Sequence, residues 1–274
     1  MAKVAHSRLA TARHGAGTTS YSVPAILAVG QLRTAGAQLL AVVFLILVWW
    51  FVSTLPSAIH IPSPAEAARS AVQLEPDVFL KDALLSTWRV TFGFIIAAVI
   101  AIPLGVTIGY SPLVRDLIFF PIELFRPIPP IAWIPLAILF FPGAEWMIVF
   151  LTFYGAFFPI VYNTVVGVSG IRSNYIRAAK SLGASEWTIF WDVVLPAALP
   201  TIFTGLYIAI SVAWLMVVAG EMIANQGGIG AMTWQAYQTT QYPRIFVGMA
   251  AIGVLGYLSS LAVRLIARII VRWE

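Results

Sequence analysis

Three ionisable residues, Glu123, Arg126 and Glu221, lie within or at the ends of long uncharged stretches of the chain. Charged groups in apolar surroundings are costly, so they usually pair with one another or face a cavity. Glu123 and Arg126 are three positions apart, which on a helix lets the two side chains neutralise each other. Alternatively, the planar guanidinium of Arg126 binds an oxyanion such as a carboxylate, sulfonate or nitrate. The spacing leaves both interpretations open.

Glu221 ends one of these stretches, next to the glycine-rich turn Asn225–Gly230. It can pair with Arg244 beyond that turn or reach the outer interface. An acid here would repel an anion, so we do not expect it to contact an anionic solute directly. Trp133 and Trp214 lie inside uncharged stretches and are further candidates for a binding site. Packing is the default interpretation for both, and cavity lining is the alternative.

The residue types needed for catalysis inside a membrane are missing from the sequence. Cysteine is absent, and the three histidines, His6, His14 and His60, are far apart in the tail or in a loop. There is no HExxH metal-binding spacing and no GxxxxGK[ST] phosphate loop. A membrane-embedded enzyme is therefore disfavoured, and we expect no metal or cofactor on this chain. Any ATP hydrolysis must come from another polypeptide.

The composition indicates an all-α integral membrane protein. Hydrophobic residues make up 60% and charged residues 10% of the chain, and the mean hydropathy is +0.91. A spanning helix needs roughly 20 apolar residues. We therefore expect about six transmembrane helices, in the uncharged runs 34–65, 90–114, 127–144, 146–171, 193–220 and 245–263. In the second run, Gly93, Gly105 and Gly109 indicate close helix packing.

The third run should be short or irregular, because six prolines fall in or beside it: Pro121, Pro127, Pro129, Pro130, Pro135 and Pro142. A broken helix at membrane depth is tolerated only where protein or water surrounds it. This places Pro129 and its neighbours in the interior of the bundle.

The distribution of positive charge predicts the orientation. With six spans both termini lie on one side of the membrane. That side carries eleven of the sixteen lysines and arginines: Lys3, Arg8, Arg13, Arg33, Arg115, Arg172, Arg177, Lys180, Arg264, Arg268 and Arg272. The positive-inside rule makes this side cytoplasmic, so the basic balance reports topology and does not indicate nucleic-acid binding. The last three arginines share one helical face and can reach lipid headgroups.

Residues 1–33 are polar and basic, which predicts a flexible cytoplasmic tail. Residues 34–274 then form a single transmembrane domain. Ser63–Glu66 has the residues of a helix start, so we expect a short surface helix from there to Leu74 on the outer side.

A charged loop at about 172–195 separates the fourth and fifth runs, and its residues 177–196 read RAAKSLGASEWTIFWDVVLP. Ser173 or Asn174 can cap a helix of about nine residues that Gly183 ends. Ser185 can start a second helix that Pro196 leads into the next span. Two short helices meeting at a glycine form a compact protrusion that a partner's groove can bind. A plain loop without a partner is the alternative.

This segment resembles the EAA loop of ABC-importer permeases in Ala178, Ala179 and Gly183, followed after nine residues by VVLP (193–196). Further pieces resemble the nitrate/sulfonate/taurine/bicarbonate branch of that family: STWRVTFGF (86–94), PIELFRPIPPIAWIPLAIL (121–139) and VVAGEMIANQGGIG (217–230). Arg177 replaces the Glu of the general pattern, as members of this branch do. FFPGAEWMI (140–148) departs from the glycine-acid-lysine pattern expected after the third span, which puts the outer gate there in doubt.

The resemblance implies a type I ABC-importer permease fold with a cytoplasmic EAA coupling helix. The residues that would contact the ATPase are Arg177, Ala178, Ala179, Leu182, Gly183, Ala184 and Ser185. The translocation pathway would involve Glu123, Arg126, Pro129, Trp133, Trp214 and Glu221.

The implied partners are two ATPase subunits that carry ATP and Mg, a second permease copy, an extracytoplasmic solute-binding protein and membrane lipid. The implied location is the inner membrane of a prokaryote. The function implied is the pore of an ATP-driven importer for a small anion. An ATP-independent channel or secondary transporter is the alternative, and it would not need the coupling loop.

Overall fold

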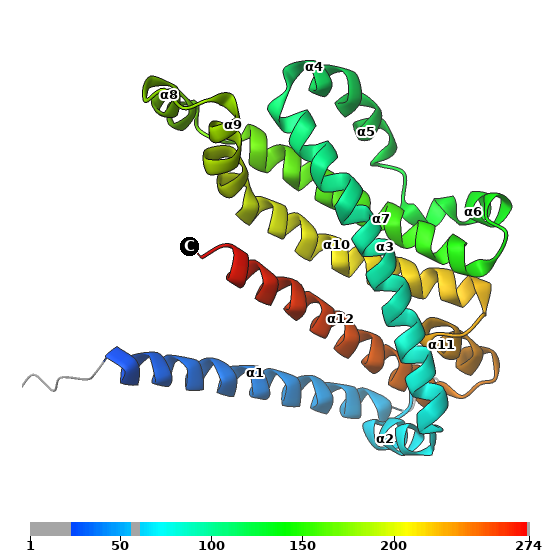
Figure 1. Ribbon diagram of the computed structural model, residues 1–274. Helices are drawn as coiled ribbons and strands as arrows, with labels where there is room; N and C mark the ends of the chain where they lie inside the picture. The colour runs from blue at the N-terminus through cyan, green and yellow to red at the C-terminus, as the bar shows by residue number, and fades with distance from the viewer. Residues whose placement is uncertain (1–22, 56–60, 273–274) are drawn as a thin grey trace, which may run out of the picture. The chain divides into compact units, whose positions relative to one another are not determined.

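The computed structural model describes residues 23–55 and 61–272 (Figure 1), and every element in these ranges is helical. The predicted all-α class is confirmed. The chain divides into two units, residues 1–59 and 60–274, which are described separately.

The first unit contains α1 (Val23–Ser53), whose apolar part runs from Leu39 to Ser53. The helix begins at Val23, so residues 23–33 are helical although the sequence predicts a flexible tail there. Their apolar residues, among them Ile26, Leu27 and Val29, are compatible with a helix that extends before the first span. The predicted tail at 1–22 lies outside the described residues.

The second unit contains four helices long and apolar enough to cross a membrane within the described residues. These are α3 (Pro76–Tyr110), α7 (Ala144–Ser169), the helical run Glu186–Ala224 and α12 (Tyr242–Ile270). The run Glu186–Ala224 comprises α9 (Glu186–Ile189), the π-helical turn η3 (Phe190–Val194) and α10 (Leu195–Ala224). These four helices, the apolar part of α1 and a broken segment are the six apolar helical elements of the described residues, and each predicted run overlaps one of them.

The broken segment consists of two arms, of which only the second lies in the predicted third run, 127–144; the first arm begins at Pro112, inside the predicted second run. One arm comprises α4 (Pro112–Val114), the π-helical turn η1 (Arg115–Phe119) and α5 (Phe120–Phe125). The other comprises the 3-10 turn η2 (Pro130–Trp133) and α6 (Ile134–Phe140). The two arms are bent by 85°. The predicted irregularity is confirmed, and Pro127, Pro129 and Pro130 lie at the bend, where they remove amide donors.

The core of the second unit lies where α3, α7 and α10 pack together (Figure 1). Small residues on α3 allow the close approach. A methyl group at Gly105 would lie 2.6 Å from Cβ of Thr164 and 2.9 Å from the carbonyl oxygen of Val161 on α7. Gly93 has the same relation to Thr152, at 2.7 Å. The glycines therefore serve helix packing, as the sequence predicts.

Short helices complete the second unit. α2 (Pro64–Gln73) starts with a capping box in which Ser63 and Glu66 satisfy each other's backbone amides, as expected from the sequence. The hydrogen bonds from Ser63 hold the pKa of Glu66 below its ordinary value. α11 (Ile229–Gln238) packs against α10, α12 and α3, and α8 (Ser173–Ser181) precedes α9.

Candidate functional site

The charged loop folds as two short helices joined at Gly183. α8 contains nine residues, and its cap is Arg172, so the predicted cap Ser173 is the first helical residue instead. At the other end Gly183 adopts φ +79°. Its N–H donates to the carbonyl of Lys180 at 3.0 Å, and the N–H of Ala184 donates to Ala179 at 3.1 Å. This is a Schellman motif, which requires a left-handed residue at Gly183.

The second short helix starts as predicted. The hydroxyl of Ser185 accepts a hydrogen bond from the N–H of Thr188 at 3.2 Å and thereby caps α9. α9 continues through η3 into α10, so the second short helix belongs to one continuous helical run that reaches the core.

Two polar contacts fix the turn between these helices. Lys180 and Glu186 form an ion pair of 2.6 Å across the turn, which raises the pKa of Lys180. The hydroxyl of Tyr110, the last residue of α3, donates to the carboxylate of Glu186 at 3.0 Å. The Tyr110 ring also meets Phe190 edge-on at 5.7 Å. The segment is therefore attached to both α3 and α10.

The two short helices present different faces. Ile176, Ala179 and Ala184 pack against a second apolar cluster formed by Val168, Ile189, Val194, Ala198 and Ile202. Tyr175, Leu182 and Trp187 point outward and are 58%, 88% and 72% exposed. Arg177, Ala178, Gly183 and Ser185 are exposed as well. A folded, anchored segment with apolar groups on its outer face is suited to bind a partner protein.

A buried ion cluster lies at the opposite end of the helices. Arg89 of α3 and Glu221 of α10 are completely buried and form an ion pair of 2.9 Å. Arg89 also pairs through two nitrogens with Glu145 at the start of α7, whose side chain is 52% exposed. The remaining guanidinium N–H groups donate to the carbonyls of Gln226 and Gly227, at 3.2 and 3.0 Å. All five donors of Arg89 are thus satisfied.

The carboxylate of Glu221 is also fixed by several hydrogen bonds. Its carboxylate accepts hydrogen bonds from the hydroxyl of Ser86 at 2.8 Å and from the N–H of Gly230 at 2.9 Å. Ser86 in turn accepts from the N–H of Ile229, and Asp82 accepts from Gly228, both at 2.9 Å. The cluster therefore attaches the glycine-rich turn to α3 and α7.

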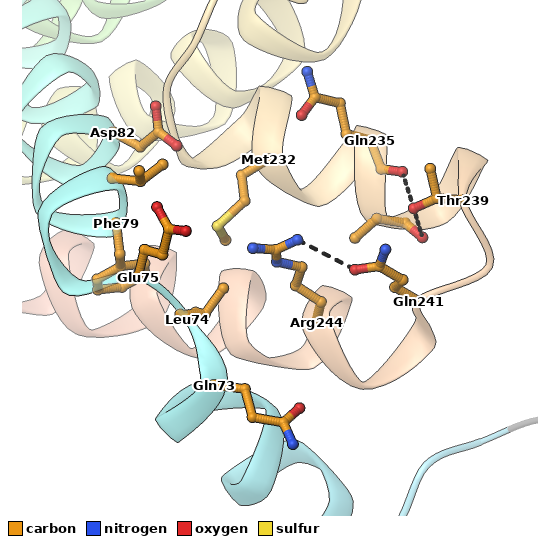
Figure 2. A pocket seen from close by; sticks show the side chains of 12 residues that line it. Gln73, Leu74, Glu75, Phe79, Asp82, Met232, Gln235, Thr239, Gln241 and Arg244 are labelled. Atoms are coloured by element: carbon orange, nitrogen blue, oxygen red, sulfur yellow. Dashed lines mark hydrogen bonds between the residues drawn. The ribbon is translucent and has the colours of Figure 1, made fainter.

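The prediction that Glu221 pairs with Arg244 is wrong, because Glu221 pairs with Arg89. Figure 2 shows Arg244 reaching from α12 into a pocket of about 400 Å³, with Glu75 and Asp82 on the opposite wall. It donates to Gln241 at 3.2 Å, and its buried Nε has no hydrogen-bond partner among the described residues. Arg89 of α3 forms the ion pair with Glu221 in place of Arg244.

Arg126 lies at the bend of the broken segment. Its guanidinium stacks over the ring of Tyr162 on α7, with 4.1 Å between Cζ and the ring centroid. The structure contains no ion pair between Arg126 and Glu123, both of which are described and exposed. Of the two interpretations, the pairing is therefore wrong, since the guanidinium lies over the ring of Tyr162 on α7 instead.

Arg126 lines a cavity of about 310 Å³ between the broken segment, α7 and α10. Tyr154 and Asn163 contribute polar groups, and Ile128, Phe158 and Val212 contribute apolar ones. Tyr154 donates to the carbonyl of Phe125 at 3.1 Å, which secures the bend. One cation among aromatic, hydroxyl and amide groups is a suitable setting for a small anion.

The sequence matches the family described as "Binding-protein-dependent transport system inner membrane component" over residues 100–273. The chain belongs to this family. It is thus an ABC transporter permease, a membrane transport component.

Relatives and solved structures agree with this assignment. The taurine transport system permease protein TauC of Escherichia coli (strain K12) is 34% identical, over 84% of this chain and 86% of TauC. The nitrate import permease protein NrtB of a Synechocystis strain is 33% identical, over 80% and 82%. A chain of the inward-facing MetNI methionine ABC transporter has a TM-score of 0.61 at 20% identity, covering 71% of this permease and 97% of that chain. The likeness to MetNI shows the fold.

The remaining predicted pathway residues of the permease lie in different settings. Pro129 is exposed at the bend, and Trp133 follows it, 4.9 Å from the Tyr154 ring, with a buried Nε1 that lacks a partner in the described part of the chain. Trp214 is buried in the core and donates to Ser259 of α12 at 3.1 Å. Trp133 therefore lies beside Tyr154, which lines the Arg126 cavity, whereas Trp214 and Glu221 do not line that cavity.

Arg89 and Glu145 are site residues that sequence reasoning missed. Both lie at the ends of uncharged runs, where a charge appears solvent-facing. The available signal was Ser86 and Arg89 on one helical face, because a polar pair at this spacing in an apolar helix requires a buried partner. No group of three or more metal-ligating side chains occurs in residues 23–55 and 61–272.

Proposed function

We propose that this permease is the pore subunit of an ATP-driven, binding-protein-dependent importer of a small anion. The observation that carries the proposal is the anchored segment α8–α9, which exposes apolar side chains at the end of a helical run leading into the core. Exposed apolar groups outside the spans indicate a protein partner. The partner we assign is an ATPase subunit, which would hold ATP and Mg, while this chain performs no catalysis.

We assign different roles to the two faces of the segment α8–α9, which we call the coupling segment. Arg177, Ala178 and Leu182 form the contact surface for the ATPase, with Gly183 and Ser185 at its edge. Ala179 and Ala184 transmit its movement, because they pack on the apolar cluster beneath α8. Closure of two ATPase subunits would move α8–α9, and α10 would pass the movement to the core and produce alternating access.

The anionic cargo is inferred from the relatives and from one cavity. TauC, NrtB and the bicarbonate permease CmpB are named for taurine, nitrate and bicarbonate, which all carry anionic oxygens. The Arg126 cavity offers a guanidinium that is free of carboxylate partners among the described residues. We assign Arg126 to the anion. Pro129 and Trp133 lie next to the lining residues Pro130 and Tyr154, and we assign them, with Glu123, to the rest of the pathway.

The assembly includes a second copy of the chain. The broken segment exposes Glu123, Arg126 and backbone interrupted by prolines, and such groups cannot face lipid. A second permease copy around a water-filled pathway covers them. An extracytoplasmic binding protein would deliver the solute at the side of the glycine-rich turn, and both termini would face the cytoplasm of a prokaryote.

The test compares two substitutions in protein purified from native membranes. Leu182→Asn should abolish co-purification of a P-loop ATPase and ATP-dependent uptake, because it removes the most exposed apolar group of the segment. Val72→Asn on α2 is the matched control, since Val72 is 87% and Leu182 88% exposed. It should leave the ATPase bound.

Recovery of the chain without any ATPase, together with solute flux in liposomes that lack ATP, would refute the proposal. That result would identify an autonomous channel or secondary transporter.

A further inference from the structure

A groove of about 550 Å³ lies between α10 and the last turns of α12. Arg264 and Arg268 of α12 line one side together with Arg272, which lies just beyond the end of that helix, so the predicted single helical face holds for the first two only. Thr204 and Tyr207 of α10 contribute hydroxyl groups. The rest of the wall is apolar and consists of Pro200, Phe203, Ala267 and Val271. The groove thus joins a strongly cationic part to an apolar part.

The three arginines are not neutralised by protein. No ion pair involves them in the described ranges, whose ion pairs are those of Arg89 and Lys180. Arg264 donates to the hydroxyl of Tyr207 and stacks over its ring, with 4.5 Å between Cζ and the centroid. Arg272 donates through Nε to the carbonyl of Ile269 at 3.1 Å. Most guanidinium N–H groups of the groove therefore remain available.

We propose that this groove binds the phosphate group of an anionic phospholipid, whose acyl chain lies along the apolar wall. Three cations that line one side of the groove fit a phosphodiester monoanion, because guanidinium groups bind phosphate oxygens in pairs. The Tyr207 hydroxyl, which accepts from Arg264, keeps its own hydrogen for a phosphate oxygen. Pro200, Phe203 and Val271 favour a ligand with an apolar tail over a free ion.

The site is separate from the cargo pathway. It rests on the location of this family in the membrane and not on the proposed substrate, so either proposal can fail alone. Because it joins α10 to α12, a bound lipid would hold the two helices together at the end of α10 that continues into the coupling segment.

The experiment measures lipid retention by native mass spectrometry after transfer from vesicles of phosphatidylglycerol and phosphatidylcholine into detergent. The wild-type protein should retain phosphatidylglycerol in preference. Each of Arg264→Gln, Arg268→Gln and Arg272→Gln should weaken that binding about fivefold. The corresponding Arg→Lys variants should lose less binding than the Arg→Gln variants, because they keep the charge and lose only the paired hydrogen bonds. Tyr207→Phe should weaken it by a smaller factor.

A triple groove variant that replaces Arg264, Arg268 and Arg272 with Gln should lose the preference altogether. Its matched control is the triple variant Arg69→Gln, Lys81→Gln and Arg115→Gln, which removes the same charge from exposed positions outside the groove. An equal loss in this control, or full retention in the groove variants, would overturn the proposal. Competition by glycerol phosphate at the same concentration as the lipid would overturn it too, because the ligand would then be a free anion. The single variants keep the test valid if a triple groove variant does not fold.

Discussion

At the scale of single residues, the ion pair between Arg89 and Glu221 holds the glycine-rich turn against α3 and α10. Both side chains are completely buried, so removing one leaves a charge without compensation. Arg89→Gln should lower the free energy of unfolding by roughly 3–5 kcal/mol. The double variant Arg89→Gln, Glu221→Gln should recover part of the loss, because it removes the uncompensated carboxylate. Thermal unfolding in detergent measures both, with exposed Arg115→Gln as the control; a double variant no better than the single one contradicts the argument.

Arg126 has a different role, since it binds no carboxylate among the described residues and lies over an aromatic ring. If it receives the anion, Arg126→Gln should reduce uptake about tenfold or more by removing a charged hydrogen bond, without a change in unfolding temperature. Arg115→Gln is the matched control, because Arg115 also stacks on a ring, that of Phe119. Unchanged uptake by Arg126→Gln would exclude Arg126 from the pathway.

At the scale of elements, the packing of α3 on α7 depends on glycine. Gly105→Ala would place a methyl group 2.6 Å from Cβ of Thr164, so the helices must separate. We expect a loss of about 1–3 kcal/mol in unfolding free energy. Gly253→Ala in α12 has no heavy atom within 4 Å and should be neutral or stabilising. Thermal unfolding of the two variants tests the comparison, and equal effects would show that helix propensity outweighs packing.

Elements with local signals could be predicted from the sequence, and contacts between distant residues could not. Ser63, Ser185 and Gly183 fix the ends of α2, α9 and α8 through hydrogen bonds to residues within five positions. The bend in the broken segment follows from prolines in the same way. Arg89 and Glu221 are 132 positions apart, so their pairing depends on how α3 packs against α10. The sequence left open whether Arg126 pairs with Glu123 for a related reason, because the contact that it makes instead is with Tyr162 on a different helix, α7.

At the scale of the whole molecule, the absence of cysteine allows the proposed water-filled pathway to be tested with single introduced cysteines. A cysteine reacts with a charged methanethiosulfonate only as the thiolate, which forms in water and not in lipid. Ile128→Cys lies in the Arg126 cavity, whereas Val99→Cys lies within the span α3 and is 66% exposed in the single chain. In the assembled transporter Ile128→Cys should react at least about tenfold faster than Val99→Cys, because the cavity is wet and the α3 surface faces lipid. The anionic reagent should also react faster than the cationic one, since Arg126 attracts it, and Arg126→Gln should remove this preference. Equal rates at the two positions would mean that the broken segment faces lipid, and the pathway would then have to lie along another face of the bundle.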